Sequence, residues 1–133
     1  MRSSSEVLRF KAEIMDELEN IGRIAGIVEK RKELRKHTEE TDVYIDSITH
    51  NLENFYMGVE ETFKRIALFT GEGVPEGPGW HSSLIKSMAR DIPGVRPSVI
   101  GEETRMLLDE YRNSDILSGT SMPSTLCRKR FSY

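Results

Sequence analysis

The sequence predicts an all-α protein, a small up-and-down bundle of four helices. Three observations lead to this prediction. Two long and two shorter segments have apolar residues at intervals of three and four, polar loops separate them, and no segment alternates apolar and polar residues as a half-buried strand would. The 133 residues suit one domain, which can bury a core without disulfide bonds.

The first predicted helix runs from about Ser5 to His37, and Ser5 is expected to cap its start. Its apolar face is formed by Ile14, Leu18, Ile21, Ala25 and Val28. The end of this segment, residues 29–37, is rich in lysine and arginine. Positive charge is favoured at the C-terminus of a helix, so we interpret this run as a solvated helix end in preference to an RNA-binding patch.

The second predicted helix, from about Asp42 to Phe69, has the strongest periodicity in the chain. Its apolar face is formed by Ile45, Ile48, Leu52, Phe55, Val59, Phe63 and Ile66. The opposite face is expected to meet solvent and carries Glu53, Glu60, Glu61, Lys64 and Arg65. Because only a short polar link, residues 38–41, joins the two long helices, we expect them to pack as an antiparallel hairpin.

Two shorter helices are predicted after a loop rich in glycine and proline, residues 70–79. The first runs from Trp80 to Asp91 and is expected to end there, because residues 92–97 contain two prolines and a glycine. The second starts near Gly101, and its inward side is formed by Leu107, Leu108 and Tyr111. The glycine-rich loop is not interpreted as a phosphate-binding loop, because it follows a helix and no Gly-Lys-Ser/Thr follows it.

Charge and cysteine content exclude several classes of protein. Lys and Arg number 19 against 22 Asp and Glu, so the net charge of −3 gives no basic field of the kind that nucleic-acid binders carry. The single Cys127 cannot form an internal disulfide, and no Cys/His pair has zinc-ligand spacing. We therefore expect no metal ion and no cofactor. No signal peptide and no membrane-spanning run is visible, which predicts a soluble, cytoplasmic protein.

The character of the sequence changes after Arg112. Residues 113–133 are rich in serine, have no helical or strand periodicity, and include a basic cluster at residues 128–130. Residues 1–112 carry 16 basic and 21 acidic side chains, whereas residues 113–133 carry 3 and 1. We therefore expect the helical bundle to occupy residues 1–112, and residues 113–133 to be a disordered tail or a segment foreign to the fold.

Several motifs resemble those of HepT-like proteins, which are small helical members of the HEPN superfamily. The motifs are residues 52–60 (LENFYMGVE), 63–67 (FKRIA), 79–81 (GWH), 92–100 (IPGVRPSVI) and 103–104 (ET). The resemblance covers about residues 5–112. It implies an all-α bundle that forms a homodimer and acts as a ribonuclease toxin, cleaving RNA without a metal ion. It also implies a partner, a nucleotidyltransferase-type antitoxin encoded beside the toxin.

The resemblance further implies a catalytic motif on the last long helix, an Arg followed four to six residues later by a polar residue, usually His. Such a His would exchange a proton with the ribose 2′-OH, and the Arg would stabilise the charge developing on phosphate. The motif is expected directly after residues 110–112, but no His follows Arg112. We therefore assign no catalytic residue and expect the chain to be inactive or impaired as an enzyme.

One hypothesis explains the missing motif and the unusual tail together. Read from the third base of the Asn113 codon, the genetic code permits Phe-Arg-His-Ile-Val-Arg-(Asn or His)-Val-Tyr-Ala-Phe, the kind of sequence that the family places here. We predict that a base was gained or lost near the codons of Arg112 and Asn113. Stop codons in the alternative frame of the gene would contradict this hypothesis.

Three residues are candidates for contact with nucleic acid. His81 follows Trp80 at a helix start and is interpreted either as a cleft residue or as a helix cap. Arg96 lies between Val95 and Pro97, where it either approaches a phosphate or holds helix-terminal carbonyls. Arg112 is the last residue before the missing motif. If none of them contacts RNA, the alternative function is a non-catalytic helical module that binds a protein or nucleotide partner.

Overall fold

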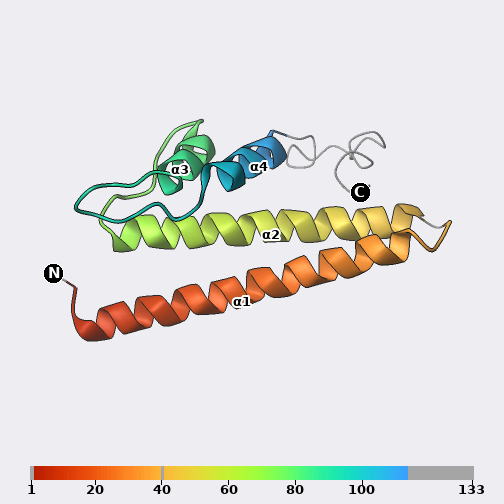
Figure 1. Ribbon diagram of the computed structural model, residues 1–133, viewed down its shortest axis with the longest axis horizontal. Helices are drawn as coiled ribbons and strands as arrows, with labels where there is room; N and C mark the ends of the chain where they lie inside the picture. Colours follow the sequence, from red (N-terminus) through yellow and green to blue (C-terminus); the bar gives the residue numbers. More distant parts are fainter. Residues whose placement is uncertain (1, 40, 114–133) are drawn as a thin grey trace.

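The computed structural model describes residues 2–39 and 41–113, and this part of the chain contains four helices and no strand. The helices are α1 (Ser4–Arg35), α2 (Thr41–Phe69), α3 (Trp80–Met88) and α4 (Glu102–Arg112). Figure 1 shows three layers: α1 lies on one side of α2, and α3 and α4 lie on the other. The prediction of an all-α bundle is confirmed, whereas residues 114–133 of the predicted tail lie outside the described residues.

Helices α1 and α2 form the antiparallel hairpin that the short polar link predicts (Figure 1). The predicted cap of α1 is wrong by two residues, because the side chain of Ser3, not Ser5, accepts a hydrogen bond from the backbone N–H of Glu6 at 3.2 Å. Three consecutive serines compete for this position, and Ser3 has the advantage of an acidic residue three positions later, as in a capping box.

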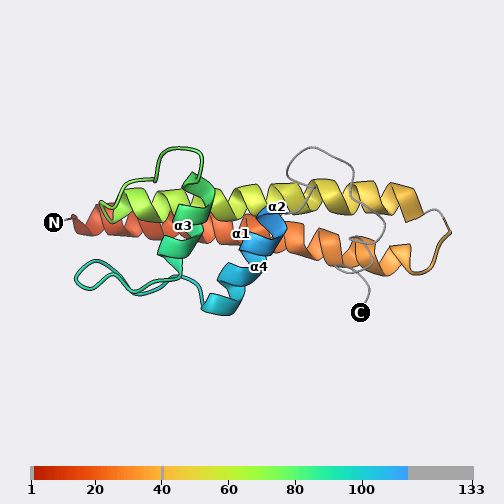
Figure 2. The ribbon, with the colours of Figure 1, turned by 90° about the horizontal axis from the view of Figure 1, so that it is seen from above.

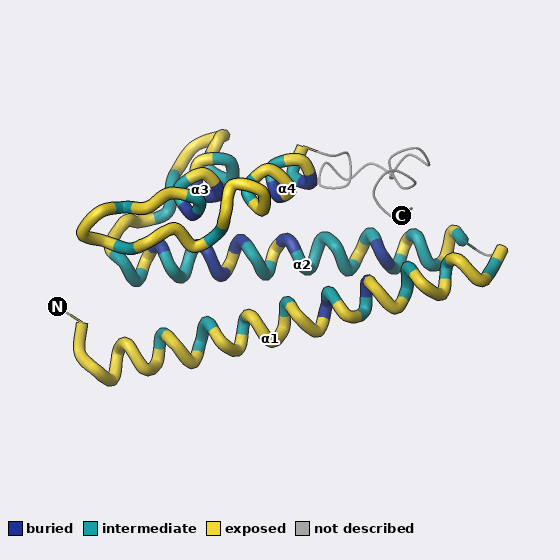
Figure 3. The backbone as a smooth tube through the Cα atoms, in the orientation of Figure 1, coloured by how far each residue is buried: buried dark blue, intermediate teal, exposed yellow. Residues whose placement is uncertain are grey.

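The main hydrophobic core lies between α2 and the layer formed by α3 and α4. Its buried members are Tyr56, Phe63, Ala67, Leu84, Ile85, Met88, Leu108 and Tyr111. A second, smaller cluster lies nearer the turn of the hairpin and contains Val28 and Ile48. Figure 3 shows that α2 has buried residues along much of its length, whereas α1 is largely exposed. The central position of α2 explains this difference, because it packs against other helices on two sides.

The predicted apolar face of α1 is buried only in part. Val28 is buried together with its neighbour Ile24, but Leu18 is 55% exposed. Nearer the N-terminus, Phe10 stacks on Phe69 of α2 with ring centroids 3.9 Å apart. Only α2 packs closely against α1 among the described helices, so one narrow stripe of α1 is covered and the rest of its apolar surface remains exposed.

Helix α3 ends at Met88, three residues before the predicted end at Asp91. The reason lies in the following segment, because the Met88 carbonyl accepts hydrogen bonds from the backbone N–H groups of Val99 at 2.7 Å and Ile100 at 3.2 Å. These bonds draw the returning chain across the end of the helix. The predicted break over residues 92–97 is confirmed as a tight turn, in which Gly94 has a φ of +79°.

Candidate functional site

The most unusual side chain of α2 is a buried carboxylate. Glu60 was predicted to face solvent, but it is only 8% exposed, so this prediction is wrong. The start of α3 lies over this part of α2, and His81 of α3 donates a hydrogen bond from Nδ1 to Oε2 of Glu60. An ionised carboxylate can only accept, so in the neutral form of the imidazole this bond places the proton on Nδ1 and the lone pair on Nε2. The pair satisfies a buried acidic group that would otherwise be costly.

The imidazole of His81 lies at the edge of the molecule, with its side chain 36% exposed. The indole of Trp80 packs beside it, with ring centroids 3.6 Å apart. The ammonium group of Lys64 lies 4.6 Å from the centroid of the same indole, a cation–π contact. The helix-cap alternative for His81 does not describe this arrangement, because Gly79 is the N-cap residue of α3 and no side chain caps that helix.

Tyr56 lies one turn before Glu60 on α2, and it packs against a second buried tyrosine, Tyr111 of α4. The rings of Tyr56 on α2 and Tyr111 on α4 have centroids 5.4 Å apart. Burial, and next the Glu60 carboxylate, raise the pKa of the Tyr56 hydroxyl well above its usual range. The positive charge of Arg112 acts on the same hydroxyl in the opposite direction. Tyr56 therefore lies within electrostatic reach of both Glu60 and Arg112.

The structure thus brings two of the three candidate residues to one stretch of α2. His81 is in the first turn of α3 and Arg112 is the last residue of α4. Figure 2 shows that the start of α3 and the end of α4 both lie over α2, because the two short helices cross it in opposite directions. We call the group of Tyr56, Glu60, His81 and Arg112 the α2 polar cluster.

Arg96, the third candidate, lies in the turn after α3, and its guanidinium is bound to a carboxylate and to backbone carbonyls. Its guanidinium forms an ion pair with Glu72, with Nε at 2.8 Å from Oε2. Its Nη2 donates to the Ser87 carbonyl at 2.9 Å, and its Nη1 donates to the Arg90 carbonyl at 3.0 Å and the Pro97 carbonyl at 3.1 Å. The side chain is only 6% exposed. These contacts hold carbonyls at the end of α3, the structural one of the two alternatives.

Comparison with known proteins identifies the family. A family model described as HepT-like protein matches residues 47–114, which is about half of the chain and contains the whole α2 polar cluster. The chain belongs to the HepT-like family. Membership indicates a toxin or ribonuclease module of HEPN type. Comparison of the sequence with curated proteins and with solved structures gives no match.

Metal binding has no visible site in the described part of this HepT-like chain. Within residues 2–39 and 41–113, no group of three or more His, Cys, Asp or Glu side chains is arranged to hold a metal ion. None of the helices in this part is long and apolar enough to cross a membrane. The α2 polar cluster itself contains an imidazole, a carboxylate, a phenol and a guanidinium group.

Sequence reasoning missed Glu60 as a site residue, although a signal for it exists. The buried residues Tyr56, Glu60, Phe63 and Ala67 follow one another at steps of four, three and four, so they share a second stripe on α2. The aromatic and apolar members of this stripe indicate a second buried face of α2, and Glu60 lies within it. Glu60 lies outside the apolar face that the periodicity of α2 predicts, and it is buried because α2 is covered on a second side by α3 and α4.

Proposed function

We propose that this protein is a HepT-like ribonuclease toxin of a toxin–antitoxin pair, and that its catalysis is impaired. The observation that carries this proposal is the family match over residues 47–114 in a chain that has no His after Arg112. The substrate is RNA, and the proposed site of action is the cytoplasm. The proposed RNA-binding groups are His81, Arg112 and, beside His81, the partly buried Trp80–Lys64 pair.

We further propose that the protein works as a homodimer. A groove of about 400 Å³ lies between α1, α2 and α4, and its lining is almost entirely apolar. The lining residues are Leu18, Ile21, Phe55, Val59, Thr62, Phe63, Val99, Ile100, Thr104, Leu107 and Leu108. An exposed apolar groove of this kind is typical of a surface that is covered in the assembled state.

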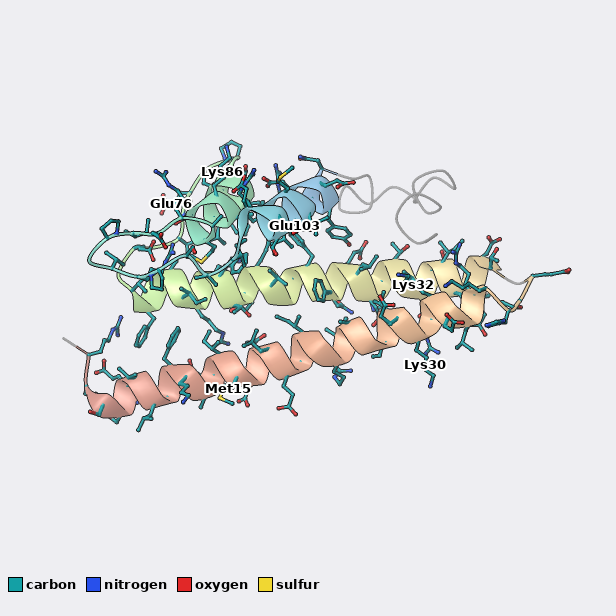
Figure 4. All side chains as sticks on the ribbon, viewed as in Figure 1. Met15, Lys30, Lys32, Glu76, Lys86 and Glu103 are labelled. Carbon is teal, nitrogen blue, oxygen red and sulfur yellow. The ribbon has the colours of Figure 1, made fainter. Side chains whose placement is uncertain are left out.

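Helix α1 extends this apolar surface. Val7, Leu8, Met15 and Leu18 are all exposed, and at 100° per residue they lie within an arc of about 100° on the helix. Met15 projects on the side of α1 away from α2 (Figure 4). Because Leu18 belongs both to this arc and to the groove, the two form a continuous apolar surface that suits a second copy of the chain.

The antitoxin and the frameshift remain parts of the proposal. A nucleotidyltransferase-type antitoxin is the proposed partner, and a small nucleotidyltransferase gene next to this one would support it. The family match ends at residue 114, close to the place where a base is proposed to have been gained or lost. The nucleotide sequence of the gene around the codons of Arg112 and Asn113 tests the frameshift directly.

An RNA cleavage assay on two chains tests the proposed activity. The first is the chain as it is, and the second carries the ending encoded by the alternative frame after Arg112. We expect the second chain to cleave single-stranded RNA much faster than the first, because it regains an Arg followed by a polar residue, Asn or His, at the spacing of the motif. Cleavage by neither chain would contradict a ribonuclease and would favour the alternative, a non-catalytic module that binds a partner through the apolar groove.

A further inference from the structure

We propose that His81 is a catalytic residue of this chain, the group that accepts the proton of the ribose 2′-OH, and that Glu60 is the positioning residue that orients it. This inference rests on the proposed ribonuclease function and deepens it. It would give a chain without the motif on its last helix a slow cleavage activity of its own.

The pair has the arrangement of a base and its orienting carboxylate. Glu60 is fixed on the central helix, with its side chain only 10% exposed, and it binds Nδ1 of His81. This bond keeps the proton on Nδ1 and the lone pair on Nε2, which is the tautomer that a general base requires. No residue in the described ranges 2–39 and 41–113 hydrogen-bonds to Nε2.

The surroundings hold the imidazole in one orientation while leaving it accessible. Trp80 packs against one side of the ring, and the indole is itself held by Lys64. The side chain of His81 is 36% exposed, so an RNA strand can reach the imidazole from the surface. A histidine that served only to satisfy a buried carboxylate would need none of this exposure.

A positive charge completes the arrangement. Arg112 of α4 follows Tyr111, whose ring lies 5.4 Å from the ring of Tyr56 on α2, and its positive charge acts on the Tyr56 hydroxyl. Its Nε is buried and has no hydrogen-bond acceptor among the described residues. A phosphate that approaches the α2 polar cluster would gain this charge as a partner.

The chemical step is a transfer of the phosphoryl group within the RNA. Nε2 of His81 takes the proton of the 2′-OH, and the 2′ oxygen forms a bond to the adjacent phosphorus. The bond from phosphorus to the 5′ oxygen of the next nucleotide breaks, and that oxygen takes a proton from water. The products are a 2′,3′-cyclic phosphate and a 5′-hydroxyl end, and His81 returns its proton to solvent.

The test uses the full chain with a single-stranded RNA that is labelled at its 5′ end. His81→Ala and Glu60→Gln are expected to lower the rate of cleavage by about 100-fold or more, the usual effect of losing a general base or its orienting partner. Free imidazole in the buffer is expected to restore part of the activity of His81→Ala. His50→Ala is the matched control, because His50 is an exposed histidine of α2 that contacts only Asn54.

A second measurement separates catalysis from binding and folding. The affinity of each variant for the same RNA with a 2′-O-methyl group at every ribose, measured by fluorescence anisotropy, is expected to stay within about threefold of the unaltered chain. Circular dichroism is expected to show unchanged helix content. A parallel loss of affinity, or no rescue of His81→Ala by imidazole, would overturn the assignment of His81 as a base.

The outcomes also distinguish this inference from the proposed function. If the chain as it is shows no cleavage and the chain with the alternative-frame ending does, the role of His81 is refuted and the proposed function stands. If neither chain cleaves, both are refuted. Cleavage by the chain as it is that Glu60→Gln leaves unchanged would refute the positioning role of Glu60 alone.

Discussion

Arg96 shows how much a single side chain can hold together. Its guanidinium joins the loop after α2, through Glu72, to the end of α3, through Ser87 and Arg90. Arg96→Met keeps the aliphatic stem and removes these bonds, so we expect it to lower the free energy of unfolding by about 2 kcal/mol. Urea unfolding followed by circular dichroism measures this. Arg90→Met is the control, because only the backbone carbonyl of Arg90 bonds to Arg96. An equal loss of stability in Arg96→Met and Arg90→Met would contradict the proposed role of the Arg96 guanidinium.

The ion pair also makes a prediction about pH. Hydrogen bonds from Arg96 hold the pKa of the Glu72 carboxyl below its usual range. A lowered pKa in the folded state stabilises the protein above the unfolded value, and this stability is lost as the pH falls through the folded value. The difference in unfolding free energy between the unaltered chain and Arg96→Met is therefore expected to shrink between pH 7 and about pH 3. If the difference in unfolding free energy stayed constant over this pH range, the ion pair between Glu72 and Arg96 would contribute nothing to stability.

Single residues were the hardest level to predict from the sequence. The sequence gives two alternatives for Arg96 and no means of choosing, because the choice depends on Glu72, which lies 24 positions away. Glu60 was assigned to solvent for a similar reason, since the helix that covers it follows a loop of uncertain course. Both errors arise from contacts between elements, which local periodicity does not contain.

The helices themselves follow local rules and were predicted more closely. Helix α2 begins at Thr41, one residue before the predicted start, and ends at Phe69 as predicted. Helix α4 begins directly after Gly101, as predicted, and has Glu102 and Glu103 in its first turn. The larger error is at the end of α3, where hydrogen bonds from Val99 and Ile100 replace a further helical turn. Those partners are not readable from the sequence of α3.

Glycines within the long helices provide a test at the level of the element. A methyl group added at Gly22 of α1 would meet no atom within 4 Å, so Gly22→Ala gains helix propensity without a clash. We expect it to raise the free energy of unfolding by about 1 kcal/mol. At Gly58 of α2 the same group would lie 3.1 Å from Cγ1 of Ile21, where the two helices approach each other. Gly58→Ala is therefore expected to stabilise less, and an equal gain in thermal unfolding experiments would show that this approach is loose.

Residues 2–39 and 41–113 leave a large apolar surface exposed at the scale of the whole molecule. Leu107 is 59% exposed at the edge of the groove, whereas Val43, equally apolar and 67% exposed, lies in the first turn of α2. If the groove forms the dimer surface, Leu107→Asp is expected to give a monomer of 15.2 kDa in sedimentation velocity, and Val43→Asp is expected to remain dimeric. If the unaltered chain itself sediments as a monomer, the proposed homodimer is contradicted.

The fold class and the family follow from the sequence because they depend on patterns within about 70 contiguous residues, and the family match covers residues 47–114. The order of the layers does not follow from such patterns. Nothing in the periodicity of α1 shows that α3 and α4 pack on the far side of α2. Leu18 of α1 is exposed because these two helices do not cover it.

The division of the interior into two unequal clusters has a consequence for how the molecule opens. The larger cluster ties residues 56–67 of α2 to both short helices, whereas the smaller one ties Val28 only to Ile48 and its neighbours. The turn end of the hairpin is therefore expected to unfold locally at a lower free energy than the rest. Amide hydrogen exchange is expected to be slowest in residues 56–67 and much faster around residues 30–45, so the hairpin would fray from its turn while the α2 polar cluster stays assembled.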